Sequence, residues 1–295
     1  MNLETFLTAV YCLIDDTLRS LLHGARLRAR GPAPVLADSE VLTMEVVGEF
    51  LGFDTDVGIH AYFSRHWVPL FPRIRAVHRT TFHRQAARLW AVKQVLWQEL
   101  VRHVRADAAL SLIDSVPIPV CRFGRASRCR LFAGTAAFGY DETARQTYYG
   151  FRAHVRVVWP GVITHLELTA ANVSDLAAAP YVLADATGCA LGDRNYWSPQ
   201  LARELAREGL ALLAPFRKAS QETHQWPRWL TNMRRRIETV FGQLVGRFHG
   251  KRVWARDRWH LTARWLRKLL SHTIALFFCQ QRGLEPLSFW RLLQT

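Results

Sequence analysis

The sequence predicts a mixed α/β protein, in which helices at the N-terminal end precede a sheet flanked by further helices. Helical periodicity dominates residues 1–105, and a strand-like apolar run begins at about residue 107. From there the pattern is strand, hairpin, helix, strand, helix, strand, which is typical of a mixed sheet covered by helices. We therefore expect a helical N-terminal domain over 1–105 and an α/β domain over 106–295 that ends in basic helices.

Two helical patterns stand out in the N-terminal part. One begins with the capping residues Asp38 and Ser39 and continues with apolar residues at helical spacing. The other runs as a single helix from 78 to 101 and places Arg84 and Arg88 four residues apart on one face. That second helix is either a recognition helix that contacts a DNA end or a member of a plain helical bundle.

In the second part, apolar runs, turn residues and caps define the elements in order. Pro160-Gly161 is a turn signal between two β-rich runs, which indicates a hairpin, and Ser198, Pro199 and Gly209 mark the two ends of a helix. We expect strands at 109–120, 148–159, 161–169, 189–193 and 210–216, helices at 174–186, 198–209, 228–248 and 258–281, and a polar loop at 217–227.

The formal net charge of +15 is concentrated in two segments. Residues 65–105 contain nine Lys and Arg against one acidic residue, and residues 228–268 contain twelve against two. In the second segment Trp254, Trp259 and Trp265 are interleaved with the arginines. Segregated positive charge among aromatic side chains indicates a surface that neutralises phosphates, so we expect a nucleic-acid partner. A diffuse, solvated basic surface is the alternative.

The remaining composition argues against a membrane or secreted protein. The apolar stretch 6–14 is short and runs into Asp15 and Asp16, so we interpret it as neither a membrane span nor a signal peptide. Five cysteines without a CxxC pair indicate reduced thiols and no zinc site. We expect a cytoplasmic, nucleoid-associated protein.

Three carboxylates occupy unusual places in this pattern. Asp114 lies within the buried run "LIDSVPIPVC", Asp193 ends a second strand, and Glu238 sits beside the apolar stripe of a basic helix. If the first strand pairs with the later parallel one and the helix crosses their ends, the three acids meet at one edge. Taken singly, each has another explanation: an Arg-paired strand residue, a turn cap and half of a surface ion pair. The competing acids Asp175 and Asp185 look like helix-end residues.

Neighbouring carboxylates repel one another, and at least one pKa would rise unless a cation lies between them. Mg²⁺, or Mn²⁺ in its place, accepts carboxylate oxygens and leaves positions for water and phosphate. Two such ions suit an in-line attack on a phosphodiester. Arg234 and Arg235 lie four and three residues before Glu238, where they would keep it ionised and contact DNA phosphates.

The region from about 107 to 270 contains the segments "LIDSVPIPVC", "YYGFRAHV", "LTAANVSD", "LGDRNYW" and "RRRIETVFGQL". As a set, these segments resemble the catalytic domain of DDE-type transposases from bacterial insertion sequences. The resemblance implies an RNase H-like fold, two Mg²⁺ ions, and cleavage and strand transfer at the ends of a mobile element. By motif position it implies Asp114, Asp193 and Glu238 as the catalytic and metal-binding residues. In such enzymes water first cuts the strand, and the freed 3′-hydroxyl then attacks target DNA.

The chain departs from the family pattern directly after Asp193. The related proteins have a basic residue, Gly and Tyr, whereas this chain has Arg194, Asn195 and Tyr196. Asn tolerates the left-handed conformation better than most residues, so we expect the turn to be kept.

A second departure concerns the basic helix. Thr231 and Val245 stand where many relatives have a Tyr and a Lys that contact the DNA end, while Arg234 keeps the family spacing. Lys251 or Arg252 is our candidate for the missing DNA contact.

Hypotheses of different classes remain. The first is an active transposase that acts on double-stranded DNA, at terminal inverted repeats and at a target, as a homodimer on DNA. The others are a catalytically inactive DNA-binding protein derived from a transposase, and a metal-dependent DNA nuclease. A further basic cluster either grips DNA near the site or is a solvated loop; it consists of Arg122, Arg125, Arg128 and Arg130.

Overall fold

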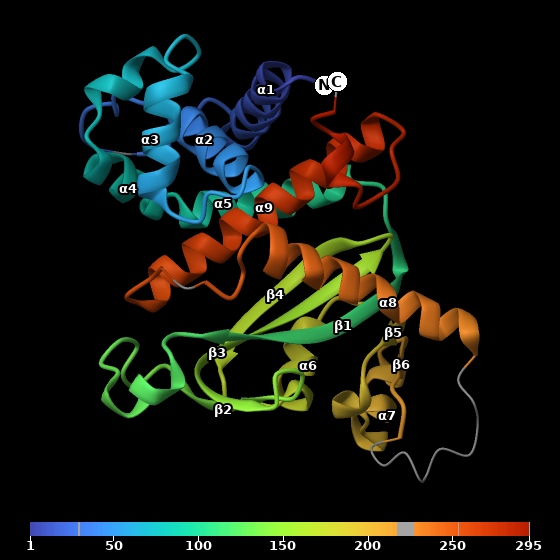
Figure 1. Ribbon diagram of the computed structural model, residues 1–295. Coiled ribbons are helices and arrows are strands. Elements are labelled where there is room, and N and C mark those ends of the chain that lie inside the picture. Colours follow the sequence, from blue (N-terminus) through green and yellow to red (C-terminus); the bar gives the residue numbers. More distant parts are fainter. Residues whose placement is uncertain (29, 217–226, 253, 295) are drawn as a thin grey trace. The chain divides into compact units, whose positions relative to one another are not determined.

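The computed structural model describes residues 1–28, 30–216, 227–252 and 254–294 (Figure 1). The chain divides into two compact units. Unit 1 comprises Met1–Val104, Arg247–His249 and Asp257–Thr295, and unit 2 comprises Arg105–Gly246 and Gly250–Arg256. The last long helix, which the sequence pattern grouped with the α/β domain, is therefore part of unit 1.

Unit 1 is an assembly of helices, as expected for the N-terminal part. Its elements are α1 (Leu3–Leu22), α2 (Asp38–Phe50), α3 (Asp56–His66), the 3₁₀ helix η1 (Pro72–Ala76), α4 (Arg79–Arg88), α5 (Trp90–His103), α9 (Arg258–Gln281) and the 3₁₀ helix η6 (Phe289–Arg291). Both α5 and α2 pack against α9, and α1 packs against α2. The Phe6 ring lies 4.9 Å from Phe50 and 5.8 Å from Phe278 between ring centroids, so the core between these helices is apolar.

Two local predictions in unit 1 are wrong. The single helix expected over 78–101 is two helices, α4 and α5, which meet at Leu89 (φ −81°, ψ 11°). This break lets α4 pack against α3 while α5 packs against α9. The N-cap of α2 is Ala37 rather than Asp38 or Ser39. Asp38 instead accepts two hydrogen bonds from the Arg28 guanidinium, each 2.6 Å long.

A buried cluster of charges joins α9 to α2, α3 and α5. We call it the buried charge cluster; its members are Glu45, Glu49, Asp56, Lys93, Arg267 and Lys268. Arg267 donates from Nε to Glu49 Oε2 (2.6 Å) and from Nη1 to Asp56. Lys93 Nζ donates to Glu45 Oε1 (2.6 Å), and Lys268 donates to Glu49. Since unpaired buried charges are costly, these contacts hold α9 in unit 1.

This cluster corrects part of the expected DNA-facing surface. Lys93, Arg267 and Lys268 belong to the two basic segments, yet their charges are balanced by carboxylates inside unit 1. Trp265 is 1% exposed and belongs to the core, whereas Trp254 and Trp259 are exposed. Only part of the segregated positive charge is therefore available to a polyanion.

Unit 2 is built around a six-stranded mixed sheet in the order β2-β3-β1-β5-β6, with β4 also paired to β3. Its elements are β1 (Asp107–Pro119), the 3₁₀ helix η2 (Phe123–Arg128), β2 (Ala137–Asp141), β3 (Gln146–Trp159), β4 (Val162–Ala170), α6 (Asp175–Val182), β5 (Gly188–Leu191), the 3₁₀ helix η3 (Arg194–Tyr196), α7 (Pro199–Arg207), β6 (Leu210–Leu213), α8 (Arg228–Gly242) and the π-helical turn η5 (Gln243–Arg247). The predicted mixed α/β class, with a sheet flanked by helices and preceded by a helical part, is confirmed.

The expected pairing of the first strand with a later parallel strand is also confirmed. β1 pairs with β5 in parallel, with Leu110 opposite Cys189 and Leu112 opposite Leu191. On its other side β1 pairs with β3 in antiparallel, with Asp114 opposite Val155. The hairpin β3–β4 forms as predicted around Pro160-Gly161.

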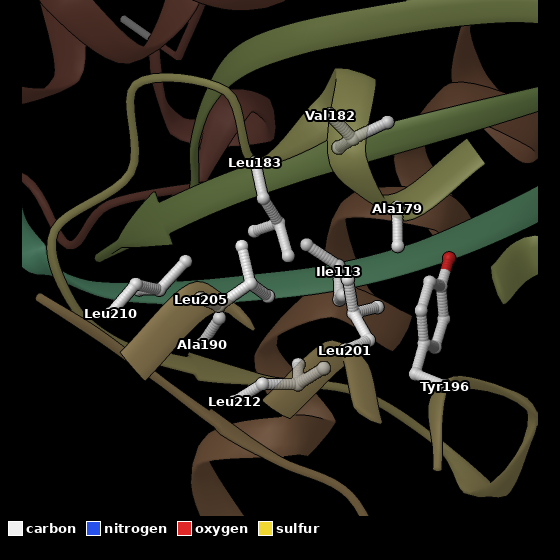
Figure 2. Close-up of a cluster of buried hydrophobic side chains, with 10 residues drawn as sticks. All are labelled: Ile113, Ala179, Val182, Leu183, Ala190, Tyr196, Leu201, Leu205, Leu210 and Leu212. Carbon is white, nitrogen blue, oxygen red and sulfur yellow. The ribbon is translucent and has the colours of Figure 1, made fainter. Parts of the chain in front are cut away.

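The two faces of β1 have different neighbours, because side chains alternate across a strand. Ile113 packs among the apolar side chains of α6, α7, β5 and β6 (Figure 2). The cluster contains Ala179, Val182, Leu183, Ala190, Tyr196, Leu201, Leu205, Leu210 and Leu212. Asp114, the next residue, therefore points to the opposite face of the sheet. Arg234 of α8 is near enough to Asp114 to lower the pKa of its carboxyl group.

Several boundaries differ from the sequence pattern. The strand β2 and the short helix η2 were not predicted, because the Gly- and Arg-rich stretch before β3 has no clear apolar period. The expected helix over 228–248 is α8 followed by a π-helical turn. The polar loop predicted at 217–227 lies, apart from Pro227, outside the described residues.

Two expectations from composition can be compared with the structure. All five cysteines are free thiols. Within the described residues, none of the helices has the length and apolar character that crossing a membrane requires.

Candidate active site

Asp114 lies on β1, two residues beyond the last residue that pairs with β5. Its Oδ1 accepts a hydrogen bond from the backbone N–H of Ser115 (2.7 Å). Over the described part of the chain, Asp114 takes part in no ion pair, so the explanation as an Arg-paired strand residue does not hold. The strand therefore carries a half-buried carboxylate whose charge is not balanced by direct contact.

Asp193 follows β5 after Gly192 and caps η3. Its Oδ1 accepts a hydrogen bond from the backbone N–H of Asn195 (2.9 Å). Gly192 allows the close approach of this loop to the sheet, because a Cβ there would lie 2.8 Å from the Tyr196 side chain. Tyr196 is itself part of the core cluster drawn in Figure 2. The capping role expected as the alternative for Asp193 is real, and it anchors the carboxylate at the end of β5.

The two aspartates share an electrostatic environment that disfavours their ionised forms. Burial raises the pKa of Asp114 to about 7, and the charges of Asp193 and Asp175 add to the rise, against the Ser115 N–H and Arg234. Burial also raises the pKa of Asp193, with a further contribution from Asp175. Arg234 opposes the rise at both positions. Two neighbouring carboxylates with raised pKa values are typical of a functional site.

Glu238 is not brought into contact with the two aspartates. It lies on α8, where it is exposed. Across the described residues, no three His, Cys, Asp or Glu side chains are close enough together to hold a metal ion. Glu238 shares a helix face with Arg234, which lies one turn earlier, about 6 Å along the helix axis. Arg234 is the residue whose charge lowers the pKa of both aspartates.

Asp175, whose sequence context is that of a helix-end residue, also lies near these aspartates. This carboxylate is 5% exposed and begins α6. Arg152 Nη1 donates to Asp175 Oδ2 (3.1 Å), and His154 Nδ1 lies 3.3 Å from Asp175 Oδ1. Burial alone would raise the pKa of Asp175, but hydrogen bonds from His154 and Ser115 and the Arg152 charge lower it. Asp175 is therefore a paired, ionised group.

Asp175 lies across the sheet from Asp114. Ser115 is opposite His154 in the β1–β3 ladder, and Arg152 is two residues before His154, so these three side chains share the face that α6 covers. Asn195 Nδ2 donates both to Asp175 Oδ2 (3.4 Å) and to Asp193 Oδ2 (3.2 Å). Asp175 thus links α6, β3 and the Asp193 loop. No signal in the sequence distinguished it from an ordinary helix-end residue.

The reason expected for Asn195 is also corrected. Asn195 is not among the described residues that have a positive φ, so its tolerance of the left-handed conformation is not used. Its backbone N–H and its side-chain amide instead hold Asp193, from two directions. A glycine at this position would supply only the backbone contact.

The basic residues expected to contact DNA lie in several places. In unit 2, Arg234 is half-buried, and Arg235 and Arg252 are exposed. Lys251 Nζ lies 3.2 Å from Asp141 Oδ2 at the end of β2. This pairing fixes the Lys251 ammonium group in unit 2 beside the sheet.

In unit 1, Arg84 and Arg88 are exposed on α4 and line a pocket of about 420 Å³. Arg28 and Arg30 line the same pocket. Arg28 is neutralised by Asp38, whereas among the described residues Arg84 has no acidic partner and donates to the backbone carbonyl of Thr80. The pocket therefore has an excess of positive charge, which fits an anionic group.

Unit 2 is therefore a mixed α/β domain whose adjacent parallel strands β1 and β5 position two aspartates with raised pKa values, Asp114 and Asp193. Residues 105–249 match the family model described as "Transposase DDE domain". The comparison with curated proteins finds no match. Among solved structures the chain is similar to a piggyBac transposase synaptic complex with hairpin DNA, determined by cryo-electron microscopy. The two chains are 9% identical with a TM-score of 0.48, and the match covers 97% of this chain and 76% of that one.

Proposed function

We propose that this protein is a DNA transposase, in which Asp114, Asp193 and Glu238 bind divalent metal ions and catalyse phosphodiester cleavage and strand transfer. The observation that carries the proposal is the pairing of β1 with β5, which brings Asp193 close enough for its charge to raise the pKa of Asp114. The family match covers both residues and Glu238.

The donor set suits Mg²⁺ or Mn²⁺. It consists of carboxylate oxygens, which hard cations prefer, and it includes no thiolate. The raised pKa values of Asp114 and Asp193 point the same way, because a cation between them would relieve the repulsion and the cost of burial. We propose that Glu238 joins the two aspartates when a cation and DNA are bound, since it is exposed one helical turn from Arg234.

In this proposal each residue has a defined part. Bound Mg²⁺ would activate the attacking oxygen and stabilise the leaving oxygen. Arg234 balances the negative charge of Asp114 and Asp193 before DNA arrives and then contacts a phosphate. Asn195 and Asp175 keep the Asp193 side chain in place from the other side of the sheet.

The proposed partner is double-stranded DNA, at the terminal inverted repeats of an element and at a target. In unit 2 the contacts would come from Arg234, Arg235, Lys251 and Arg252. In unit 1 they would come from Arg84 and Arg88, at the basic pocket. Because two element ends must be joined, we propose that a homodimer forms on DNA.

Cleavage of a duplex that carries the inverted repeats bounding the coding region tests this function. We expect the full chain to cut this duplex with Mg²⁺ and not with EDTA. Asp193→Asn and Glu238→Gln should each reduce the cleavage rate by on the order of 10³-fold, with gel-shift affinity unchanged within about threefold. Glu204→Gln, on the exposed face of α7, is the matched control and should cut normally.

The alternative functions predict different results in the same assay. A catalytically inactive derivative would bind the repeats without metal-dependent cutting. A nuclease would cut but leave no product in which the new 3′ end is joined to target DNA. Undiminished cutting by Glu238→Gln would remove Glu238 from the site and leave the two aspartates as its acids.

Arg235 offers a separate test of the DNA contacts. It is exposed on α8, so Arg235→Ala should remove one phosphate contact and lower the slope of log affinity against log salt by about 1. Fluorescence anisotropy with a repeat duplex, measured at salt concentrations from about 50 to 200 mM, gives that slope. Arg207→Ala, on the exposed face of α7, is the control and should leave the slope unchanged. An unaltered slope for Arg235→Ala would mean that this arginine is only solvated.

A further inference from the structure

One exposed surface of unit 2 has no part in the proposed chemistry. It is formed by the segment around η2 and by the outer face of β2, and we call it the aromatic–arginine surface. Its members are Phe123, Phe138 and Tyr140, which are 57%, 49% and 51% exposed, together with the exposed arginines Arg122, Arg125, Arg128 and Arg130. Figure 1 shows the connection between β1 and β2 as a loop that extends beside β2.

The aromatic rings are held in place by the sheet. Phe138 and Tyr140 are two residues apart on β2 and therefore share one face of the strand. Between them, Gly139 lies against the backbone of Ala171, where a Cβ would stand 2.5 Å from the carbonyl oxygen. Phe123 meets Phe138 edge to face, with ring centroids 6.5 Å apart. One side of β2 is thus packed, and the ring-bearing side is open.

The charge of this surface is uncompensated. Residues 120–140 contain no Asp or Glu. In the described chain, none of the four arginines takes part in an ion pair. Four positive charges beside three half-exposed rings are complementary to a polyanion that also presents flat apolar groups. A nucleic-acid strand has this combination, because its phosphates pair with arginine and its bases stack on aromatic rings.

Exposed rings of this kind can stack only on unpaired nucleotides. In a duplex the faces of the bases are covered by their neighbours, so a side chain can stack only on a base that has left the helix. Two residues along a strand span about 7 Å, which is twice the 3.4 Å separation of stacked bases. The spacing of Phe138 and Tyr140 along β2 therefore leaves room for one base between them.

This surface is tied to the candidate active site by a single guanidinium. Arg152 Nη2 donates to the backbone carbonyl of Tyr140 (3.0 Å), and Nη1 of the same group donates to Asp175 and to Ser115 Oγ (3.4 Å). Ser115 is the residue after Asp114. In the ladders of β3, Phe138 is opposite Tyr149 and Asp114 is opposite Val155, so the rings and Asp114 lie on the same face of the sheet. A strand that lies on the aromatic–arginine surface would therefore run toward Asp114.

We propose that the aromatic–arginine surface binds unpaired nucleotides of the DNA strand next to the phosphodiester that reacts. Phe138 and Tyr140 stack on the bases, Phe123 supports Phe138, and the four arginines pair with the strand's phosphates. The assignment of the strand as DNA rests on the proposed function, but the binding itself does not require cleavage.

Binding to a labelled 15-nucleotide oligothymidine and to a duplex of the same length, in EDTA, tests the inference by fluorescence anisotropy. The double variant Phe138→Leu/Tyr140→Leu keeps the apolar bulk and removes both rings. We expect it to lose about tenfold or more in affinity for the single strand, because stacking on one ring is typically worth that much. Its affinity for the duplex should stay within about twofold. Placing abasic sites in the oligonucleotide should weaken binding to the wild type but not to the variant.

Matched controls separate stacking from general damage. Tyr181→Leu removes an aromatic ring that is 70% exposed on α6 and should leave both affinities unchanged. Arg125→Gln should lower the salt slope of single-strand binding, whereas Arg203→Gln on α7 should not. Thermal melting verifies that each variant is folded.

Three results would overturn the inference. These are an unchanged single-strand affinity of the double variant, an equal loss for single strand and duplex, and a change from dimer to monomer with normal single-strand binding. The last would assign the rings to contact with a second copy of the chain. The binding assay contains no metal and therefore does not depend on cleavage. If the single-strand affinity depends on the rings but the protein never cuts DNA, the proposed catalysis is contradicted and the present inference stands.

Discussion

Replacing Asp114 with asparagine is expected to abolish cleavage and, in the absence of metal, to stabilise the protein at neutral pH. The reason is the pKa of Asp114, which burial and the charges of Asp193 and Asp175 raise to about 7. Between the ordinary pKa of 3.8 and this value, the native state binds more protons than the unfolded state. The stability of the wild type therefore falls as pH rises through that interval.

Asparagine does not titrate, so the gain of Asp114→Asn should be absent below pH 4, grow between pH 4 and 7, and stay constant above. One pKa unit corresponds to about 1.4 kcal/mol, so the gain is a few kcal/mol at most. Urea unfolding in EDTA at several pH values measures it. The cleavage assay should show a loss on the order of 10³-fold.

Asp185 is the matched control for this experiment. It pairs with Arg156 (2.6 Å), and although burial acts to raise its pKa, the hydrogen bond from Arg156 lowers it. Asp185→Asn should therefore give no gain at neutral pH and should cut DNA normally. If Asp114→Asn were less stable than the wild type at neutral pH, Asp114 would be a structural residue whose contacts hold the strand.

The largest expected loss of stability follows from Arg267→Ala in the buried charge cluster. Burial by itself would lower the pKa of Arg267, but the charges of Glu49, Asp56 and Glu45 outweigh it and raise the pKa. Removing the guanidinium takes one cationic partner from each of these buried carboxylates. Glu45 and Glu49 keep a lysine each, and Asp56 keeps His83 and Arg264. Breaking a buried ion pair in this way costs about 3–5 kcal/mol. We expect unit 1 to unfold at a correspondingly lower urea concentration.

Two further variants make that measurement specific. Arg19→Ala breaks the exposed pair with Asp15 and should cost less than about 1 kcal/mol. Arg267→Lys keeps the charge but cannot reach both Glu49 and Asp56, so its loss should be intermediate, and it remains measurable if Arg267→Ala does not fold. An Arg267→Ala protein as stable as Arg19→Ala would show that the cluster contributes nothing.

Much of the secondary structure was predictable because apolar periods and caps are local. The helix 258–281 was predicted with the bounds that α9 has, and the hairpin followed from the Pro160-Gly161 turn. The break at Leu89 and the strand β2 were not predictable. Both depend on neighbours that are remote in sequence, since α4 and α5 have different packing partners and β2 is completed by pairing with β3.

In the candidate site, too, some residues were predictable from local sequence and others were not. Asp114 was recognisable because a carboxylate within an apolar strand is costly, and Asp193 because it follows a second such strand. Asp175 was dismissed because a helix-end aspartate is common, and nothing local indicates that Arg152 and His154 would bury it. For Glu238, the helical spacing predicted the face shared with Arg234, but did not decide between a site at the sheet and the exposed position that the structure has.

By itself, the sequence determined the mixed α/β class, the order of the elements, the parallel approach of Asp114 and Asp193, and the total positive charge. Only the tertiary structure decided which charges face solvent. Arg267 and Lys268 pair with a carboxylate on α2, more than 200 residues earlier, whereas the arginines around η2 pair with no carboxylate in the part of the chain that the structure describes. The physical reason is that periodicity reports which side of an element is apolar. The partner of a charged side chain is set by which elements meet, and that depends on the whole chain.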